Sequence, residues 1–258
     1  MSTARIKRLQ KHLKLDTDGV IGPATLSAFE NAILGKEDSS KDKRLYSLTL
    51  SQKGFYQLVH HEISSPTYYK KRLQKPVWPG GASGVTVGIG YDLGYHRDYH
   101  IRRDWGPFVS DEDLKKLIAV AGKKGNNAKL QIPKLKHIRI PYEAAATVFS
   151  ESTLPRYAAA TKKTFKGIEK CVPDVQSAIL SLVYNRGTRL SGSKRKEMKA
   201  IQSLIKQQQY DEIGDQIIAM KRLWENTGLK GLLKRRDDEA ALIFEANQNY
   251  DWQELIRV

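Results

Sequence analysis

The stretch HHEISSPTYYKKRLQKPVWPGGASGVTVGIGYDLG, residues 60–94, joins the end of a predicted helix to a short strand flanked by glycines. Residues 51–62 predict the helix, because Phe55, Leu58 and Val59 recur at helical spacing. Residues 64–82 are rich in Pro, Tyr, Trp and Gly and predict irregular structure. Residues 84–91 place β-branched side chains between glycines and predict a strand or hairpin.

Three side chains of this stretch could carry chemistry. Glu62 ends the predicted helix, Thr86 lies on the strand and Asp92 follows it. If the strand folds back under the helix, two carboxyls and a hydroxyl face one cleft, which is what glycoside hydrolysis needs. One carboxyl donates a proton to the leaving oxygen, and burial would raise its pKa for that role. The other directs water or stabilises the developing positive charge.

A structural explanation of the same residues competes with the catalytic one. Glu62 would then be an exposed acid at a helix end, and Asp92 a turn former. Sequence spacing alone does not decide between the two.

The rest of the chain after residue 110 reads almost entirely as helix. Ser110 is a favourable N-cap, and proline stands in the first turn of several of the helices. One small β element in a mostly helical domain predicts an α+β fold with the β piece segregated. The expected helices cover residues 111–121, 141–153, 173–184, 197–208, 210–224 and 232–247.

Residues 84–94 resemble the strand-and-turn signature of phage-type lysozymes, in which a helix-borne Glu precedes a T-x-G-x-G segment. Glu62, Thr86, Gly88 and Gly90 match that pattern, and residues 178–187 are similar to a later helix followed by Asn-x-Gly. The commonest members place the catalytic Asp between Glu and Thr, where this chain has no acid. The pesticin-like branch places it six residues after the Thr, which is Asp92 here. The resemblance therefore implies Glu62, Asp92 and Thr86 as catalytic residues.

A second resemblance concerns the N-terminal residues. They are similar to the small peptidoglycan-binding domain of cell-wall hydrolases, a three-helix-type module with a Leu-Gln pair and a D-G-x-x-G-x-x-T turn. The residues that match it are Leu9, Gln10, Asp18, Gly19, Gly22, Thr25, Ala28 and Phe29. We therefore expect a wall-binding module over 1–35, a polar linker over 36–46, and a lysozyme-like catalytic domain with a small β-hairpin lobe over 47–258.

The expected substrate contacts come from aromatic, polar and cationic side chains near these motifs. Aromatic rings can stack on sugars, although core or rim packing is their more frequent fate. A guanidinium after the later helix could bind sugar oxygens or a peptide carboxylate, or else cap the helix. The candidates are Trp78, Ser83, Tyr91, Asn185 and Arg186.

Composition limits the partners. The 258 residues hold 44 Lys and Arg against 28 Asp and Glu, a formal net charge of +16, which attracts polyanions. Recognisable nucleic-acid signatures are missing, so we expect peptidoglycan as the partner, with anionic envelope polymers or lipid as further ones. No metal site or cofactor is expected, since His96 and His100 lack a completing carboxylate. A monomer is expected.

The chain shows no signal peptide, and its single cysteine, Cys171, excludes an internal disulfide. Synthesis in the cytoplasm followed by holin-type release or secretion to the cell wall is expected. Together these features predict a muramidase that cleaves the β-1,4 bond between N-acetylmuramic acid and N-acetylglucosamine, as a phage endolysin. The alternatives are a secreted antibacterial muramidase, a non-catalytic wall-binding or phage structural protein, and a nucleic-acid-binding protein.

Overall fold

The computed structural model describes residues 46–246 and 249–258, and Tyr46–Val258 form one compact unit. The expected wall-binding module at 1–35, with Leu9, Gln10, Asp18, Gly19, Gly22, Thr25 and Phe29, lies outside the described residues. The linker residues 36–45 lie outside them too.

The described unit is predominantly helical, with two small two-stranded sheets, which is an α+β fold. The α-helices are α3 (Gln52–Ile63), α4 (Pro66–Arg72), α5 (Asp98–Trp105), α6 (Asp111–Ile118), α7 (Asn126–Lys129), α8 (Ile132–Leu135), α9 (Tyr142–Val148), α10 (Leu154–Thr164), α11 (Pro173–Arg186), α12 (Lys196–Gln207), α13 (Tyr210–Ala219) and α14 (Lys230–Phe244). The strands are β1 (Thr49–Ser51), β2 (Thr86–Val87), β3 (Tyr91–Asp92) and β4 (Leu255–Arg257).

The predicted elements are mostly confirmed, with two kinds of correction. Ser110 caps α6 as expected, because its hydroxyl accepts a hydrogen bond from the Asp113 N–H. The prediction of irregular structure over 64–82 is wrong for α4, where Pro66 occupies the first turn and the Ser65 hydroxyl caps the helix. Helices α5 and α10 were not predicted, and a π-helical turn at Phe149–Thr153 connects α9 to α10.

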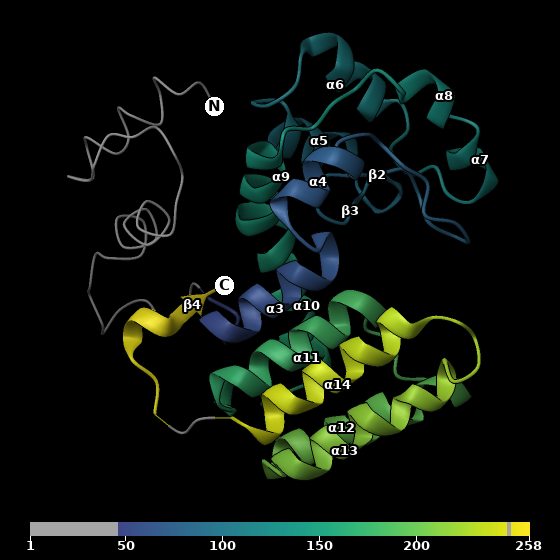
Figure 1. Ribbon diagram of the computed structural model, residues 1–258. Coiled ribbons are helices and arrows are strands. Elements are labelled where there is room, and N and C mark those ends of the chain that lie inside the picture. Colours follow the sequence, from purple (N-terminus) through teal and green to yellow (C-terminus); the bar gives the residue numbers. More distant parts are fainter. Residues whose placement is uncertain (1–45, 247–248) are drawn as a thin grey trace. The chain divides into compact units, whose positions relative to one another are not determined.

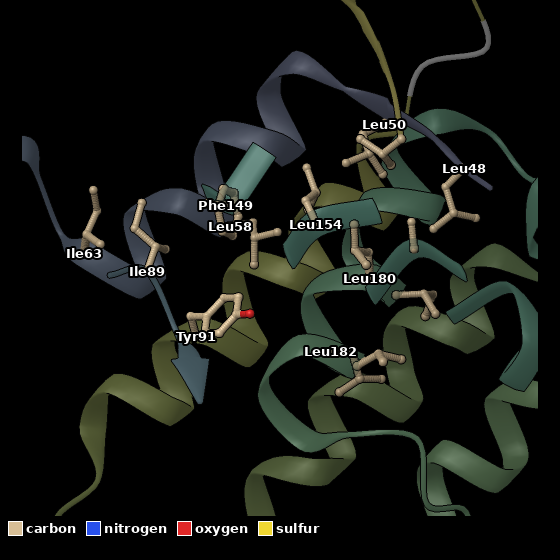
Figure 2. Close-up of a cluster of buried hydrophobic side chains, with 14 of the residues drawn as sticks. Leu48, Leu50, Leu58, Ile63, Ile89, Tyr91, Phe149, Leu154, Leu180 and Leu182 are labelled. Atoms are coloured by element: carbon tan, nitrogen blue, oxygen red, sulfur yellow. The ribbon is translucent and has the colours of Figure 1, made fainter. Parts of the chain in front are cut away.

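Figure 1 shows two groups of elements in the described unit. One group holds α4–α9 with β2 and β3, and the other holds α10–α14, with α3 between them. Helix α11 packs against α3, α10 and α14, and its residues 174–183 are all buried. A helix that is buried on every side forms the core of its domain. Figure 2 shows side chains of the buried hydrophobic cluster: Leu58 and Ile63 from α3, Ile89 and Tyr91 from the hairpin, Leu154 from α10, and Leu180 and Leu182 from α11.

The sheet of β1 and β4 fixes the start of α3. Thr49 pairs with Arg257 in an antiparallel register that was not predicted from sequence. The backbone N–H of Ser51 donates to the Ser177 hydroxyl of α11, while the Ser51 hydroxyl caps α3 by accepting from the Gly54 N–H. Helix α3 is therefore anchored where it begins, so the position of its last turn is set by the core.

The predicted hairpin is confirmed as β2 and β3, in which Thr86 pairs with Asp92 and Val87 with Tyr91. Two glycines form the turn between the strands with positive φ, +59° at Gly88 and +66° at Gly90. A Cβ at Gly88 would lie 2.6 Å from the Trp105 ring, and one at Gly90 would collide with the Tyr184 hydroxyl. The glycines of the T-x-G-x-G segment are thus required by backbone conformation and by close packing.

Replacing Gly90 by alanine is expected to destabilise the protein by about 2–4 kcal/mol, from left-handed strain plus overpacking. The matched control is Gly122→Ala, where φ is +72° but nothing lies near the added Cβ, so only about 1–2 kcal/mol should be lost. Chemical denaturation measures both values. Equal losses in the two variants would show that contact with Tyr184 contributes nothing.

Candidate active site

Glu62 lies in the last turn of α3 with its side chain only 18% exposed. Its Oε1 accepts a hydrogen bond from Arg235 Nη1 of α14 at 2.7 Å. Burial raises the pKa of Glu62 above its ordinary value, although the charge and hydrogen bond of Arg235 act in the opposite direction. The explanation of Glu62 as an exposed helix-end acid is therefore wrong.

Arg235 belongs to a buried group of charges on α14. Its Nε lies 3.2 Å from Glu239 Oε1, and the same oxygen accepts from Arg236 Nη2 at 2.7 Å. Ser181 of α11 donates its hydroxyl to Glu239 at 2.6 Å, and its hydroxyl and carbonyl oxygens both accept from Arg235 Nη2. Because Arg235, Arg236 and Glu239 are each at most 5% exposed, the group holds Arg235 rigidly against Glu62.

Asp92 lies opposite Thr86 across the hairpin. Its carboxylate accepts hydrogen bonds from the Gly84 N–H, at 3.0 Å to each oxygen, and from the Gly94 N–H at 2.8 Å. Asp92 therefore does form the turn, as the structural explanation expected. Its partly exposed carboxylate is also held in a fixed orientation, as an acid that positions water or a cation must be.

Two tyrosines connect the carboxyl of α3 with that of the hairpin. The rings of Tyr157 and Tyr184 lie 4.3 Å apart, and the Tyr184 hydroxyl donates to the Ile89 carbonyl in the hairpin turn. The pKa of Tyr157 is raised by burial and by the negative charges of both Glu62 and Asp92. Both carboxyls therefore lie within electrostatic reach of one phenol, that of Tyr157.

Of the two expected aromatic contacts, Tyr91 is buried and Trp78 is half-buried. Tyr91 is 1% exposed and donates its hydroxyl to Asp104 at 2.8 Å, so its ring belongs to the core and stacking on a ligand is excluded. Trp78 is half-buried, and its Nε1 donates to the Ser83 carbonyl at 3.1 Å. The structure therefore brings Trp78 and Ser83 together but removes Tyr91 from the set.

Asn185 and Arg186 form the end of α11. Asn185 is exposed, whereas Arg186 is half-buried, with its guanidinium 4.9 Å from the Trp224 ring. Its Nη2 donates to the Lys194 carbonyl at 2.5 Å, which lies outside the helix that it would have capped. Arg186 therefore binds the 188–195 segment through the Lys194 carbonyl, and this hydrogen bond does not involve the carbonyls of its own helix.

Sequence reasoning missed three residues around the site, namely Arg235, Tyr157 and Tyr95. In the run 234–236, Arg235 and Arg236 are buried, whereas the Lys234 side chain is 69% exposed. Tyr95 is 64% exposed, lies within electrostatic reach of Tyr157, and carries the Lys124 ammonium 3.5 Å from its ring centroid. Tyr95 follows Asp92 by three positions, so the sequence already offered an aromatic side chain beside the hairpin.

Among residues 46–246 and 249–258, no three His, Cys, Asp or Glu side chains gather as a metal site would require. None of the helices in this part of the chain is long and apolar enough to cross a membrane.

The described residues define a mainly helical α+β protein in which a buried, arginine-paired glutamate and a hairpin aspartate both lie within electrostatic reach of Tyr157. Residues 56–236 match the family model described as a domain of unknown function (DUF8812), and the chain belongs to that family. The matched region contains Glu62, Thr86, Asp92, Tyr157 and Arg235. The comparison with curated proteins gave no match.

Proposed function

We propose that this protein is a peptidoglycan hydrolase that cleaves the β-1,4 glycan backbone between N-acetylmuramic acid and N-acetylglucosamine. The observation that carries the proposal is that a buried carboxyl of raised pKa, Glu62, and a carboxylate held by backbone hydrogen bonds, Asp92, both lie within electrostatic reach of Tyr157. Two carboxyls in unlike environments are the equipment for acid-assisted glycoside cleavage.

Glu62 is the general acid in this mechanism. Its burial favours the protonated form, so a proton is available for the glycosidic oxygen as the bond to the anomeric carbon breaks. Arg235 is a positioning residue, since it fixes one carboxyl oxygen and limits how far the pKa rises. Asp92 stabilises the positive charge that develops on the sugar or directs the attacking water, and Thr86, its partner across the hairpin, binds that water.

Trp78, Ser83 and Asn185 remain as proposed substrate contacts, and exposed Tyr95 joins them. The resemblance of residues 1–35 to a peptidoglycan-binding domain supports the same substrate, since a weak polymer binder raises the local substrate concentration. We assign the protein to lysis by a phage, as an endolysin, with a secreted antibacterial muramidase as the alternative.

The test incubates purified peptidoglycan with the full chain and measures new reducing ends. The proposal expects release by the wild type and its loss in Asp92→Asn, because an amide cannot carry the charge. Undiminished release by Asp92→Asn would contradict a catalytic role. Asp92 would then serve only to form the turn, through its hydrogen bonds with Gly84 and Gly94.

The pH dependence of hydrolysis gives a further prediction. Because the protonated form of Glu62 is active, the rate should fall as pH rises through its pKa, which burial places above that of an ordinary carboxyl. In Arg235→Gln the lowering influence is gone, so the falling limb should move to higher pH. In the wild type the neighbouring His61 does not interfere, since burial and Arg235 lower its pKa to about 4.

The measurement is the pH profile of kcat/KM for the wild type and Arg235→Gln. Both are first shown by circular dichroism to be folded over the pH range used. A limb at the same pH in both proteins would contradict the assignment of that limb to Glu62.

A further inference from the structure

A basic hollow lies beyond the end of α11. It has a volume of about 760 Å³, within the range of ligand sites, and Arg189, Leu190, Ser191, Lys196, Lys199 and Gln202 contribute to its lining. Its three cations, Arg189, Lys196 and Lys199, are exposed. Among the described residues none of the three forms an ion pair, so their charge is available to a ligand.

Two of these cations occupy an unfavourable place in the fold. Helix α12 begins at Lys196, so Lys196 and Lys199 both lie in its first turn, where the helix dipole favours acidic side chains. Glu197 is the one acid of that turn, but its carboxylate is 2% exposed and accepts from Arg222 Nε at 2.6 Å. Cations at this position weaken the helix, and an anion bound in the hollow would compensate them.

Further arginines raise the positive potential at this end of the unit. Burial lowers the pKa of Arg186 to about 10, with further lowering by the positive charges of Arg195 and Arg236. Arg189 likewise repels Arg195, whose pKa is lowered by burial and by that neighbour. Arg186 Nε is buried without a hydrogen-bond partner in the described part of the chain. The group is therefore short of negative charge.

The hollow and the proposed catalytic site share a helix. Ser181 of α11 contacts Arg235 beside Glu62, and α11 ends at Arg186, five residues or about 7.5 Å further along. The hollow begins at Thr188, just past that end. The proposed catalytic site and the hollow are therefore connected through the C-terminal part of α11.

We propose that this basic hollow binds a free carboxylate of the peptide carried by the cell-wall glycan. Arg189, Lys196 and Lys199 would contact the carboxylate, while Gln202 and Ser191 offer hydrogen bonds to peptide amides. The lining contains no aromatic side chain on which a base could stack, which favours a peptide over single-stranded nucleic acid. The inference rests on the proposed function, since it names a second part of the same substrate.

The test measures binding, which does not require cleavage. Full-length Glu62→Gln protein is titrated calorimetrically with a soluble disaccharide-tetrapeptide, once with free carboxylates and once with these amidated. The test variant, called the hollow variant, adds Arg189→Gln, Lys196→Gln and Lys199→Gln. The matched control adds Lys134→Gln, Lys136→Gln and Lys166→Gln, which remove the same charge from exposed positions elsewhere.

The proposal expects the hollow variant to raise Kd at least ten-fold and the control less than two-fold. Amidation of the peptide should have the same effect as the hollow substitutions. The amidated peptide should bind the intact hollow as weakly as the peptide with free carboxylates binds the hollow variant. Equal weakening in both variants would overturn the proposal, because net charge would then explain it. If a 20-base-pair DNA duplex bound more tightly than the peptide, and if the same hollow substitutions weakened that binding, the proposal would be overturned in favour of nucleic acid.

The side chains that differ between these variants and the Glu62→Gln protein are all exposed, so thermal unfolding should be nearly unchanged among them. Lys199→Gln alone is a milder substitution, for which we expect about three-fold weaker binding. The outcome is separable from that of the proposed function. If the wild type releases no reducing ends but the peptide still binds through the hollow, hydrolysis fails and the hollow stands. If hydrolysis occurs and the hollow variant binds normally, only the hollow fails.

Discussion

Glu62→Gln should lower the rate of peptidoglycan hydrolysis by about 10²–10⁴-fold, the usual contribution of a general acid. Glutamine has nearly the shape of glutamate but has no acidic proton for the leaving oxygen. It can still accept a hydrogen bond from Arg235 Nη1, so the packing at the end of α3 should persist. The measurement is release of reducing ends from purified peptidoglycan at saturating substrate.

Glu151→Gln is the matched control for this substitution. Glu151 is exposed, so the same chemical change there should leave hydrolysis within about two-fold of the wild type. Rates that remain at the wild-type level in Glu62→Gln would remove Glu62 from the mechanism, whatever the protein hydrolyses.

Glu239→Ala should destabilise the protein by about 3–5 kcal/mol, because removing one partner from a buried ion pair leaves uncompensated charge. Glu239 is fully buried, and one of its oxygens contacts Arg235, Arg236 and Ser181. Its loss leaves two buried guanidinium groups without their shared carboxylate. Chemical denaturation of the full chain measures the change in the free energy of unfolding.

The control on the same helix is Asp237→Ala. The Asp237 side chain is 48% exposed and contacts Lys221 at 2.6 Å, and a surface pair of this kind contributes about 0–1 kcal/mol. Similar losses at 237 and 239 would show that α14 is sensitive to any substitution, and that the buried charges have no special weight. Glu239→Ala should also lower hydrolysis, because Arg235 would lose the group that fixes it.

Local signals account for the part of the fold that could be predicted. The hairpin follows from β-branched residues between glycines, and the glycines themselves are required by positive φ and by contacts with Trp105 and Tyr184. Helix α6 follows from the Ser110 cap. Each of these features depends on residues that are neighbours in the sequence, so the sequence displays them directly.

The contacts that complete the site are not local. Glu62 and Arg235 are 173 residues apart, and strand β4 pairs with β1 across nearly the whole described unit. The sequence around Arg235 is rich in both charge signs, yet Arg235, Arg236 and Glu239 are buried, and the one Glu239 carboxylate pairs with both guanidinium groups. Such burial follows from tertiary packing, which periodicity does not reveal.

Tyr91 was expected to contact the substrate, but the structure places it in the core. A tyrosine beside a predicted catalytic aspartate suggested a surface for sugar stacking, but strand alternation turns its side chain to the face opposite that of Asp92. There its hydroxyl finds the buried acceptor Asp104, which also accepts from Ser152 at 2.8 Å and from Arg103. Tyr95, at the end of the 3-10 turn Leu93–Tyr95 that follows, is the exposed aromatic ring of this segment.

The structure shows where part of the chain's positive charge lies. Of the +16, the residues after 45 contribute +13, and several of these charges gather at the end of α11 and the start of α12. Unpaired cations in a hollow differ from a diffuse basic surface, because they define where an anionic branch of the substrate would bind.

The most direct test of the central claim is mass spectrometry of the sugar at the new reducing end, after borohydride reduction of peptidoglycan digested by the full wild-type chain. We expect products that end in N-acetylmuramitol, formed at least about 10²-fold more slowly in a Glu62→Gln digest. Digestion without any reduced amino sugar, for example by cleavage of peptide bonds alone, would contradict it.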